Sequence, residues 1–173
     1  MEVKVRRAKI VDCGLVFNLT KRAFQDYNDP NLFPTTPGLL ESKEEVISDI
    51  KNKEVLIAYV NDKPVGSVRF YSDNGKEFYL FRLGVLNKYQ SQGVGKKLIS
   101  EVEARVKDQG GERITLYSAY RLKELLAFYQ SLGYEIIGTK DDSDYTRAII
   151  SKNLDNESNK DDREEDNYEV MGR

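Results

Sequence analysis

Hydrophobic positions alternate with polar ones in some parts of the chain and recur every three to four residues in others. This mixture predicts both strands and helices. Alternation predicts strands over residues 3–10, 54–60, 67–71, 77–86 and 113–119, and in the segments YEIIGT and YTRAIIS. Helical spacing predicts helices over residues 12–26, 42–52, 92–109 and 121–132. Ser42 to Glu45 forms a capping box at the start of the second helix, and Gly133 closes the fourth.

The predicted order of elements is β-α-α-β-β-β-α-β-α-β-β. Hairpins come first and strand–helix–strand units follow, so we expect an α/β fold with helices on both faces of a mixed sheet. Residues 26–40 interrupt the pattern with three prolines and a glycine. We expect them to form an irregular loop in which Tyr27, Leu32, Phe33 and Leu39 pack over another part of the protein.

The chain has 173 residues, which suits one domain, and no internal repeat is visible. From residue 152 onward it carries eight acidic and four basic residues and few apolar ones. We therefore expect a folded domain over residues 1–153 and an acidic, disordered tail over residues 154–173.

The absence of histidine excludes most familiar catalytic machinery. A chain without histidine has no histidine general base, no Ser-His-Asp or Cys-His catalysis and almost no zinc site of a known type. The one cysteine, Cys13, excludes an intrachain disulfide, and the net charge of −2 does not suggest nucleic acid as a partner. No apolar run approaches the ~20 residues that span a bilayer, so we expect a cytoplasmic protein that uses no metal and no membrane.

The segment YQSQGVGKKLI places two glycines where a helix should begin. Gly93 and Gly95 fail the P-loop pattern and also the dinucleotide pattern, in which Leu98 stands where the third glycine belongs. Residues 90–95 do match [Q/R]-x-x-G-x-[G/A] after a strand. Unpaired N–H groups in the first turn of a helix bind phosphate, and glycines let phosphate oxygens reach them. The alternative is that both glycines only begin a helix beside a tight turn.

A second segment, LLAFYQSLGYE, ends in Tyr129-Gln-Ser-Leu-Gly133-Tyr134. Together with LGVLNKYQSQGVGKKLI it resembles the GNAT superfamily of acyl-CoA N-acyltransferases, over roughly residues 3–151. The resemblance implies the GNAT fold, with a splayed sheet, and acetyl-CoA as co-substrate. It implies cofactor contacts from the strand and the turn that follows it: Leu83, Gly84, Val85, Gln90, Ser91, Gln92, Gly93, Val94, Gly95 and Lys96.

The resemblance also implies a general acid. Tyr129 matches the family tyrosine that protonates the leaving thiolate; the alternative is a core aromatic beside Phe128. The family's carboxylate base, where one exists, corresponds to Tyr79, and Glu77 lies two residues earlier on the same expected face, so either is a candidate proton acceptor. Leu122 stands where the family often has an asparagine that helps to hold the cofactor.

We therefore expect an N-acetyltransferase that transfers an acetyl group from acetyl-CoA to a primary amine by direct attack. The acceptor amine belongs either to a small molecule or to a protein, and the sequence leaves a homodimer open. The alternative is a non-catalytic module on the same fold that binds acyl-CoA or another protein.

Overall fold

The computed structural model describes residues 1–25, 37–142 and 145–154. The strands are β1 (Val3–Arg7), β2 (Glu54–Val60), β3 (Lys63–Ser72), β4 (Glu77–Val85), β5 (Arg113–Ala119), β6 (Glu135–Asp141) and β7 (Thr146–Asn153). The helices are α1 (Cys13–Phe24), α2 (Pro37–Leu40), α3 (Lys43–Asn52), α4 (Val94–Asp108) and α5 (Lys123–Ser131). Short 3-10 turns precede α1 and α4.

The strands form one mixed sheet in the order β1-β2-β3-β4-β5-β7-β6. Every neighbouring pair is antiparallel except β4 and β5, which are parallel and are connected through α4. The predicted α/β class and order of elements are confirmed, with one addition. Residues 37–40, which the sequence assigned to an irregular loop, form the single helical turn α2.

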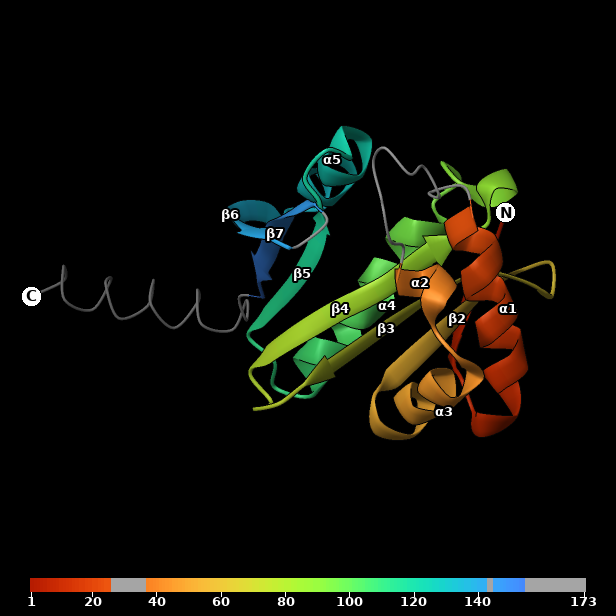
Figure 1. Cartoon of the computed structure of the whole chain (residues 1–173). Coiled ribbons are helices and arrows are strands. Elements are labelled where there is room, and N and C mark those ends of the chain that lie inside the picture. Colours follow the sequence, from red (N-terminus) through yellow and green to blue (C-terminus); the bar gives the residue numbers. More distant parts are fainter. Residues whose placement is uncertain (26–36, 143–144, 155–173) are drawn as a thin grey trace, which may run out of the picture.

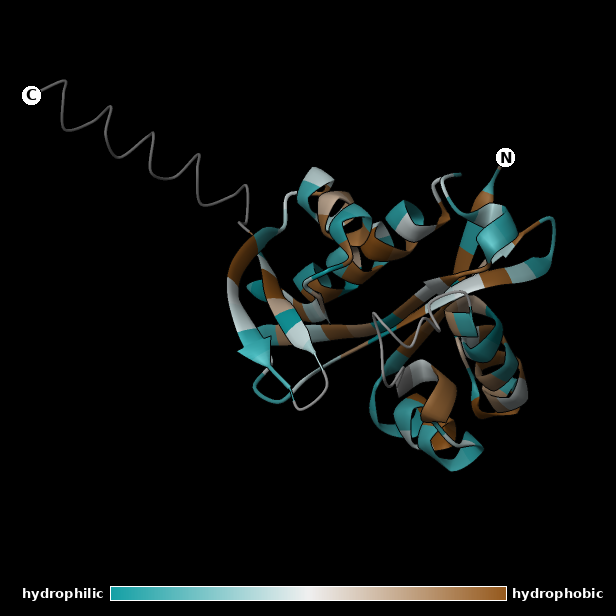
Figure 2. Cartoon of the chain, turned by 45° about the horizontal axis from the view of Figure 1, so that its top comes forward, coloured by the Kyte–Doolittle hydropathy of each residue, from teal (hydrophilic) through white to brown (hydrophobic). Residues whose placement is uncertain are grey.

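Helices cover both faces of the sheet, and each face has its own core (Figure 2). Successive residues of β2 show how the pleat divides them: Leu56 packs on the α4 side with Leu98, whereas Ile57 packs on the other side with Val16 of α1 and Val46 of α3. All five of these side chains are buried. The alternation that predicted the strands therefore arises from burial on two faces.

The start of α3 and the end of α5 have the capping residues that the sequence predicted. Ser42 caps α3, and its Oγ accepts a hydrogen bond from the N–H of Glu45 at 3.2 Å. Gly133 follows α5 with a φ of +91°, the left-handed conformation of a helix-terminating glycine.

Strands β4 and β5 pair only at their first residues. The ladder joins Glu77–Tyr79 to Arg113–Thr115 and then stops, although β4 continues to Val85 and β5 to Ala119. Figure 1 shows β5 turning away from β4 toward α5. Beyond Tyr79 and Thr115, the backbone N–H and C=O groups on the facing edges of β4 and β5 therefore form no ladder hydrogen bonds with each other.

Leu154 belongs to the folded part of the chain. It is 6% exposed, packs into the core on the α4 side, and donates its N–H to the carbonyl of Glu112 at 2.8 Å. The sequence assigned this residue to the tail; the remaining tail residues, 155–173, lie outside the described residues, as do Tyr27, Leu32 and Phe33 of the loop.

Candidate active site

A β-bulge in β4 sets the geometry of the site. Ser67 of β3 pairs with Gly84, but Arg69, two residues on, pairs with Phe81, three residues back along β4. Arg82 carries the distortion and has a φ of +53°, which is uncommon for a residue with a side chain. Bulges re-aim side chains beside active sites, so the residues on either side of Arg82 face in different directions.

The bulge corrects one inference from strand alternation. Continuous alternation would put Leu83 and Val85 on the same face as Tyr79 and Phe81. Instead Leu83 and Val85 pack against the core on the α4 side, and Gly84 faces α1, where an added Cβ would lie 3.0 Å from Phe24. Phe81, before the bulge, packs edge-on against Tyr71 of β3 at 5.8 Å between ring centroids.

A cleft of about 230 Å³ opens where β4 and β5 diverge. Its walls come from residues 80–83 of β4, residues 116–119 of β5, Leu122, Leu125 and Tyr129 at α5, Phe24 and Gly38 near α2, and Tyr145 and Arg147 at β7. It therefore brings together Leu83 and Tyr129, two of the predicted site residues that lie far apart in the sequence. The cleft is largely apolar, as binding sites for organic ligands commonly are.

Residues 90–95, here called the glycine turn, lead into the start of α4, just beyond the end of β4. Ser91 and Gly93 both have a left-handed backbone, with φ of +60° and +86°. Lys97 donates the first intrahelical hydrogen bond, to the carbonyl of Gly93 at 3.0 Å, so the N–H groups of residues 94–96 precede the helical ladder. No heavy atom lies within 4 Å of a Cβ added at Gly93, so the space outside the turn is open.

Gly95 has a different role from Gly93. A Cβ at Gly95 would lie 3.3 Å from the ring of Phe128 on α5 and 3.9 Å from Val85, so this glycine lets α4 approach α5 and the end of β4. Val94 between the two glycines is buried in the core, which leaves only its backbone for a ligand.

Gln90 serves the turn itself. Its side-chain Nε2 donates to the carbonyl of Val85 at 3.1 Å, and its N–H donates to the carbonyl of Asn87 at 3.2 Å. The side chain of Gln92 likewise donates to the carbonyl of Lys88 at 3.1 Å. These contacts hold the turn against β4. Of the predicted phosphate ligands, the backbone of residues 91–96 fits an anion better than Gln90 does.

Tyr129 lies on the inner face of α5 and is 3% exposed. Its ring packs edge-on against Phe128 and Tyr134, with centroid distances of 5.2 Å and 5.8 Å. Because Tyr129 also lines the cleft, the core-aromatic role and the acid role are compatible: packing fixes the ring of a residue on the cleft wall.

Leu122, which replaces the family's frequent asparagine, is the N-cap of α5 and provides no side-chain cap. It lines the cleft with Leu125, so this wall presents hydrocarbon where an amide would offer a hydrogen bond. A ligand arm at this wall has apolar contacts with these two side chains.

Glu77 and Tyr79 lie outside the described wall of the cleft. Glu77 sits at the paired ends of β4 and β5, where its Oε1 accepts hydrogen bonds from Arg113 at 3.0 Å and Thr115 at 3.1 Å. The nearby Glu77 carboxylate raises the pKa of Tyr79, which disfavours a phenolate there. This placement gives neither residue direct contact with a reacting amine in the cleft.

A buried ion cluster beside the cleft was not predicted from the sequence. Arg69 of β3 is fully buried and forms a bidentate pair with Glu41, 2.7 Å for each bond. Arg69 also donates to Asp49 at 2.9 Å and to Thr20 at 3.2 Å. The cluster ties α1, α2 and α3 to the sheet, and its only sequence signal is one arginine inside an apolar strand.

The described residues contain neither a membrane-spanning helix nor a cluster of metal ligands. No helix in residues 1–25, 37–142 and 145–154 has both the length and the apolar character needed to span a membrane. Within the same residues, no group of three or more Cys, Asp or Glu side chains is arranged to hold a metal ion.

The fold has clear counterparts among solved structures. A GNAT-family acetyltransferase from Streptococcus pneumoniae superposes with a TM-score of 0.73 over 89% of this chain and 100% of its own, at 21% identity. The PaiA N-acetyltransferase of Thermoplasma acidophilum, solved in complex with coenzyme A, gives the same TM-score and coverage at 18% identity.

Sequence comparison agrees with the fold. An uncharacterized acetyltransferase of Streptococcus pyogenes is 31% identical over 109 residues, which cover 61% of this chain and 71% of that protein. N-alpha-acetyltransferase 50 of Danio rerio is 36% identical over 88 residues, covering 49% of this chain and 52% of that protein. The model of the acetyltransferase (GNAT) family matches residues 19–134, which include the cleft-lining residues other than Tyr145 and Arg147, the glycine turn and Tyr129. The chain therefore belongs to the GNAT family of acetyltransferases and is an N-acetyltransferase enzyme.

Proposed function

We propose that this enzyme transfers the acetyl group of acetyl-CoA to a primary amine by direct attack. The observation that carries the proposal is the cleft between the diverging strands, which has Leu83 on one wall and Tyr129 on another. The helix that carries Tyr129 also packs against the glycine turn, through Phe128 and Gly95. The relatives named above include an N-acetyltransferase solved with coenzyme A, which supports the choice of co-substrate.

The residues fit acetyl-CoA at both of its ends. The backbone N–H groups of residues 91–96 would hold the pyrophosphate, aided by the positive end of the α4 dipole and by the exposed Lys96. Lys97 is engaged with Glu101 at 3.5 Å in the next turn. The edge of β4 at residues 83–85 that faces β5, beyond the end of the β4–β5 ladder, would receive the pantetheine arm, beside the apolar wall of Leu122 and Leu125. When bound, acetyl-CoA supplies an activated acetyl thioester.

The reaction moves two protons. The acceptor nitrogen forms a bond to the acetyl carbon, the carbon–sulfur bond breaks, and the nitrogen loses a proton while the sulfur gains one. Tyr129 donates to the departing thiolate, since a phenol of pKa ~10 is a donor of suitable strength for a thiol of pKa ~8.5. Its buried ring has its position fixed by Phe128 and Tyr134.

The amine must be neutral before it attacks. A lysine-like amine costs about 4–5 kcal/mol to deprotonate at pH 7. Glu77 and Tyr79 remain candidates for the proton only through intervening water, because neither lines the described part of the cleft. We therefore assign the proton of the amine to water that connects the cleft with solvent. We also propose that the enzyme is cytoplasmic.

The test is a screen of amines with acetyl-CoA, read by release of free thiol and by mass of the product. Turnover with at least one amine supports the proposal. The alternative, a module that binds acyl-CoA without reaction, predicts calorimetric binding of acetyl-CoA and no thiol release above buffer with any amine.

A further inference from the structure

Arg82 is the residue on the cleft wall whose charge is least compensated. Among the described residues, three cations lie around the buried carboxylate of Glu41 and the partly buried carboxylate of Asp49: Arg69, Lys53 and Arg82. Glu41 already holds Arg69 at 2.7 Å through both oxygens, whereas the Nε of Arg82 lies 3.5 Å from Glu41. Three positive charges thus face two negative ones among the described residues, and Arg82 makes the longest of these contacts.

The terminal nitrogens of Arg82 are open to a ligand. Only Nε of Arg82 has a hydrogen-bond partner among the described residues, and the side chain is 24% exposed. A guanidinium presents five N–H donors in a fork that matches a carboxylate. The contact to Glu41 anchors Nε, the Cζ of Arg82 lies 6.0 Å from the centre of the Phe81 ring, and neither terminal nitrogen has a hydrogen-bond partner among the described residues.

The bulge places this arginine at the cleft. The backbone of Arg82 has a φ of +53°, a strained conformation for a residue with a Cβ, and strain of this kind concentrates at functional sites. Its contact with Glu41, next to α2, puts the side chain on the α1 and α2 side of the sheet, opposite the α4 helix whose N-terminus suits the pyrophosphate. An anion bound by Arg82 would therefore lie on the face of the sheet opposite the proposed pyrophosphate site, where an acceptor can enter without meeting the phosphates.

The other charged residue of the described cleft wall is also positive. The charged residues that line the cleft are Arg82 and Arg147, and no Asp or Glu is among the described lining residues. Arg147 is paired with Asp142 at 2.7 Å, so Arg82 is the better donor for a ligand. A polycationic acceptor would find two arginines and no described carboxylate, which is unfavourable.

We infer that Arg82 binds a carboxylate of the acceptor, so that the enzyme acetylates an amine whose molecule also carries a nearby carboxylate. The inference rests on the proposed acetyl transfer and specifies its acceptor class. The carboxylate is either the main-chain carboxylate of an amino acid or an acidic side chain near the N-terminus of a peptide.

Matched acceptor pairs test this directly. One arm compares free amino acids with their C-terminal amides, and the other compares amidated peptides with Glu or Gln at the second position. We expect the carboxylate member of at least one arm to have a kcat/KM about tenfold or more higher, the range of a charge-assisted hydrogen bond. The arm that shows the preference identifies the source of the carboxylate.

Variants assign the preference to Arg82. In Arg82→Gln the ratio within the pair should fall below about threefold, and Arg82→Lys should recover part of it, because lysine keeps the charge and loses the fork. Lys53 is another cation of the same cluster, but it is not among the described residues that line the cleft. Lys53→Met should therefore keep the wild-type ratio of kcat/KM values within the pair. Calorimetry of acetyl-CoA, expected unchanged in all three variants, shows that each retains its fold and cofactor site.

Several outcomes would overturn the inference. Equal kcat/KM within both pairs, a ratio unchanged by Arg82→Gln, or acetylation confined to amines without a carboxylate, such as polyamines, would each remove Arg82 from acceptor recognition while leaving acetyl transfer established. Binding of acetyl-CoA without acetylation of any amine would instead overturn the proposed function, and this inference with it.

Discussion

At the scale of single residues, Tyr129 and Tyr134 separate two roles that a buried tyrosine can have. Both are almost fully buried and their rings touch, yet only Tyr129 is on the described cleft wall. The hydroxyl of Tyr134 donates to Glu103 at 3.1 Å, and burial, with the neighbouring carboxylate, raises its pKa. Position relative to the cleft, more than burial, is therefore the reason that we propose Tyr129 and not Tyr134 as the proton donor.

Tyr129→Phe should lower turnover by about 10–10³-fold, because a proton donor to the thiolate acts mainly in the transition state. Acetyl-CoA affinity should change little, since the turn of α4 is untouched. Tyr134→Phe is the matched control: it removes a hydroxyl from the same aromatic group, should cost about 1 kcal/mol of stability, and should keep turnover. Near wild-type turnover in Tyr129→Phe, with chemistry rate-limiting, would leave water as the proton source.

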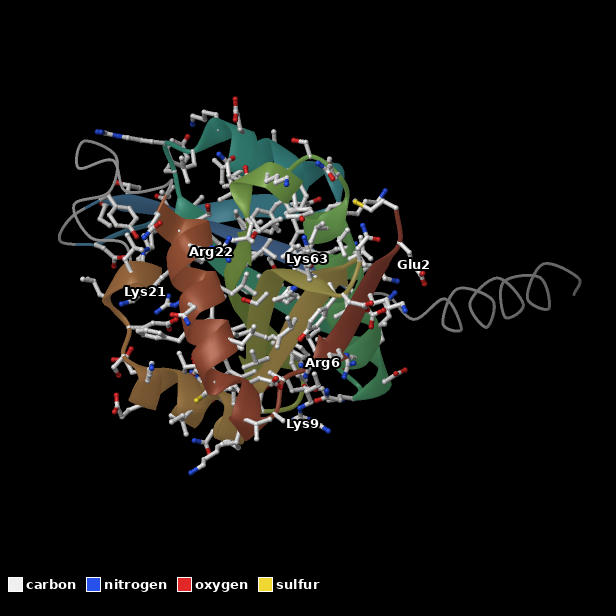
Figure 3. The ribbon with its side chains drawn as sticks, turned by 90° about the vertical axis from the view of Figure 1, so that its right-hand side faces the viewer. Glu2, Arg6, Lys9, Lys21, Arg22 and Lys63 are labelled. Atoms are coloured by element: carbon white, nitrogen blue, oxygen red, sulfur yellow. The ribbon has the colours of Figure 1, made fainter. Side chains whose placement is uncertain are left out.

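Asp12 supplies a residue-scale prediction about pH. Arg6, labelled on β1 in Figure 3, donates to both Asp12 oxygens at 2.8 Å and 2.9 Å. These hydrogen bonds lower the pKa of Asp12 from 3.8 to about 2. A pKa depressed in the folded state stabilises the fold above the unfolded value, and this contribution is lost as pH falls from about 4 through about 2.

Asp12→Asn should therefore reduce the free energy of unfolding by about 1 kcal/mol at pH 7, after allowance for solvent screening of an exposed arginine. The difference from wild type should shrink toward zero between pH 4 and pH 2. Urea titrations of both proteins at several pH values measure it. A difference that stays constant over this range would mean that Asp12 acts through packing and not through its charge.

At the scale of elements, the parts that were predictable are those whose burial repeats with a fixed period. Strands over residues 54–60 and 113–119 have the predicted bounds, because their side chains alternate between two buried faces. The helix expected from residue 92 begins at Val94, since Gly93 adopts a left-handed backbone that ends the preceding turn. The spacing of hydrophobic residues alone does not reveal which residue adopts such a left-handed backbone.

The parts that were not predictable depend on contacts between distant residues. Arg82 and Glu41 are 41 positions apart, and the bulge that brings Arg82 toward Glu41 reverses the facing of the residues after it. Leu83 and Tyr129 were identified through family motifs, not through periodicity, and the cleft brings them together. Phe24, Tyr117 and Tyr145 also line the cleft, and no local pattern distinguishes them from other aromatic residues.

The start of α4 gives the element-scale prediction. Asn and Asp tolerate the left-handed backbone of Gly93 and have nearly the same shape, so Gly93→Asn and Gly93→Asp differ chiefly in charge. We expect Gly93→Asp to weaken acetyl-CoA binding more than tenfold relative to Gly93→Asn, because its carboxylate would repel a pyrophosphate at the same N–H groups. Calorimetry on both folded variants measures this; equal affinities would move the phosphate site elsewhere.

At the scale of the whole molecule, one sheet joins β1 to β7, and Leu154 packs into the core on one of its faces. The β6–β7 hairpin completes the sheet beside β5, and β7 ends at Asn153, next to the point where Leu154 enters the core. This packing ties the end of the described chain to Glu112, just before β5. The residue at the boundary therefore contributes to the same core that supports α4 and the divergence of the two central strands.

The contribution of Leu154 can be separated from that of the tail, which we propose does not stabilise the domain. A chain ending at Asn156 should keep the melting temperature and acetyl-CoA affinity of the full chain. A chain ending at Asn153 loses the buried leucine and should lose about 1.5–3 kcal/mol, or roughly 3–12 °C in Tm for a domain of this size. Leu154→Ala in the full chain, expected to lower stability by a similar amount, checks that the loss comes from this side chain and not from the new carboxylate. A large drop in the chain ending at Asn156 would show instead that residues beyond it dock on the domain, and equal stability of all four proteins would contradict the packing of Leu154.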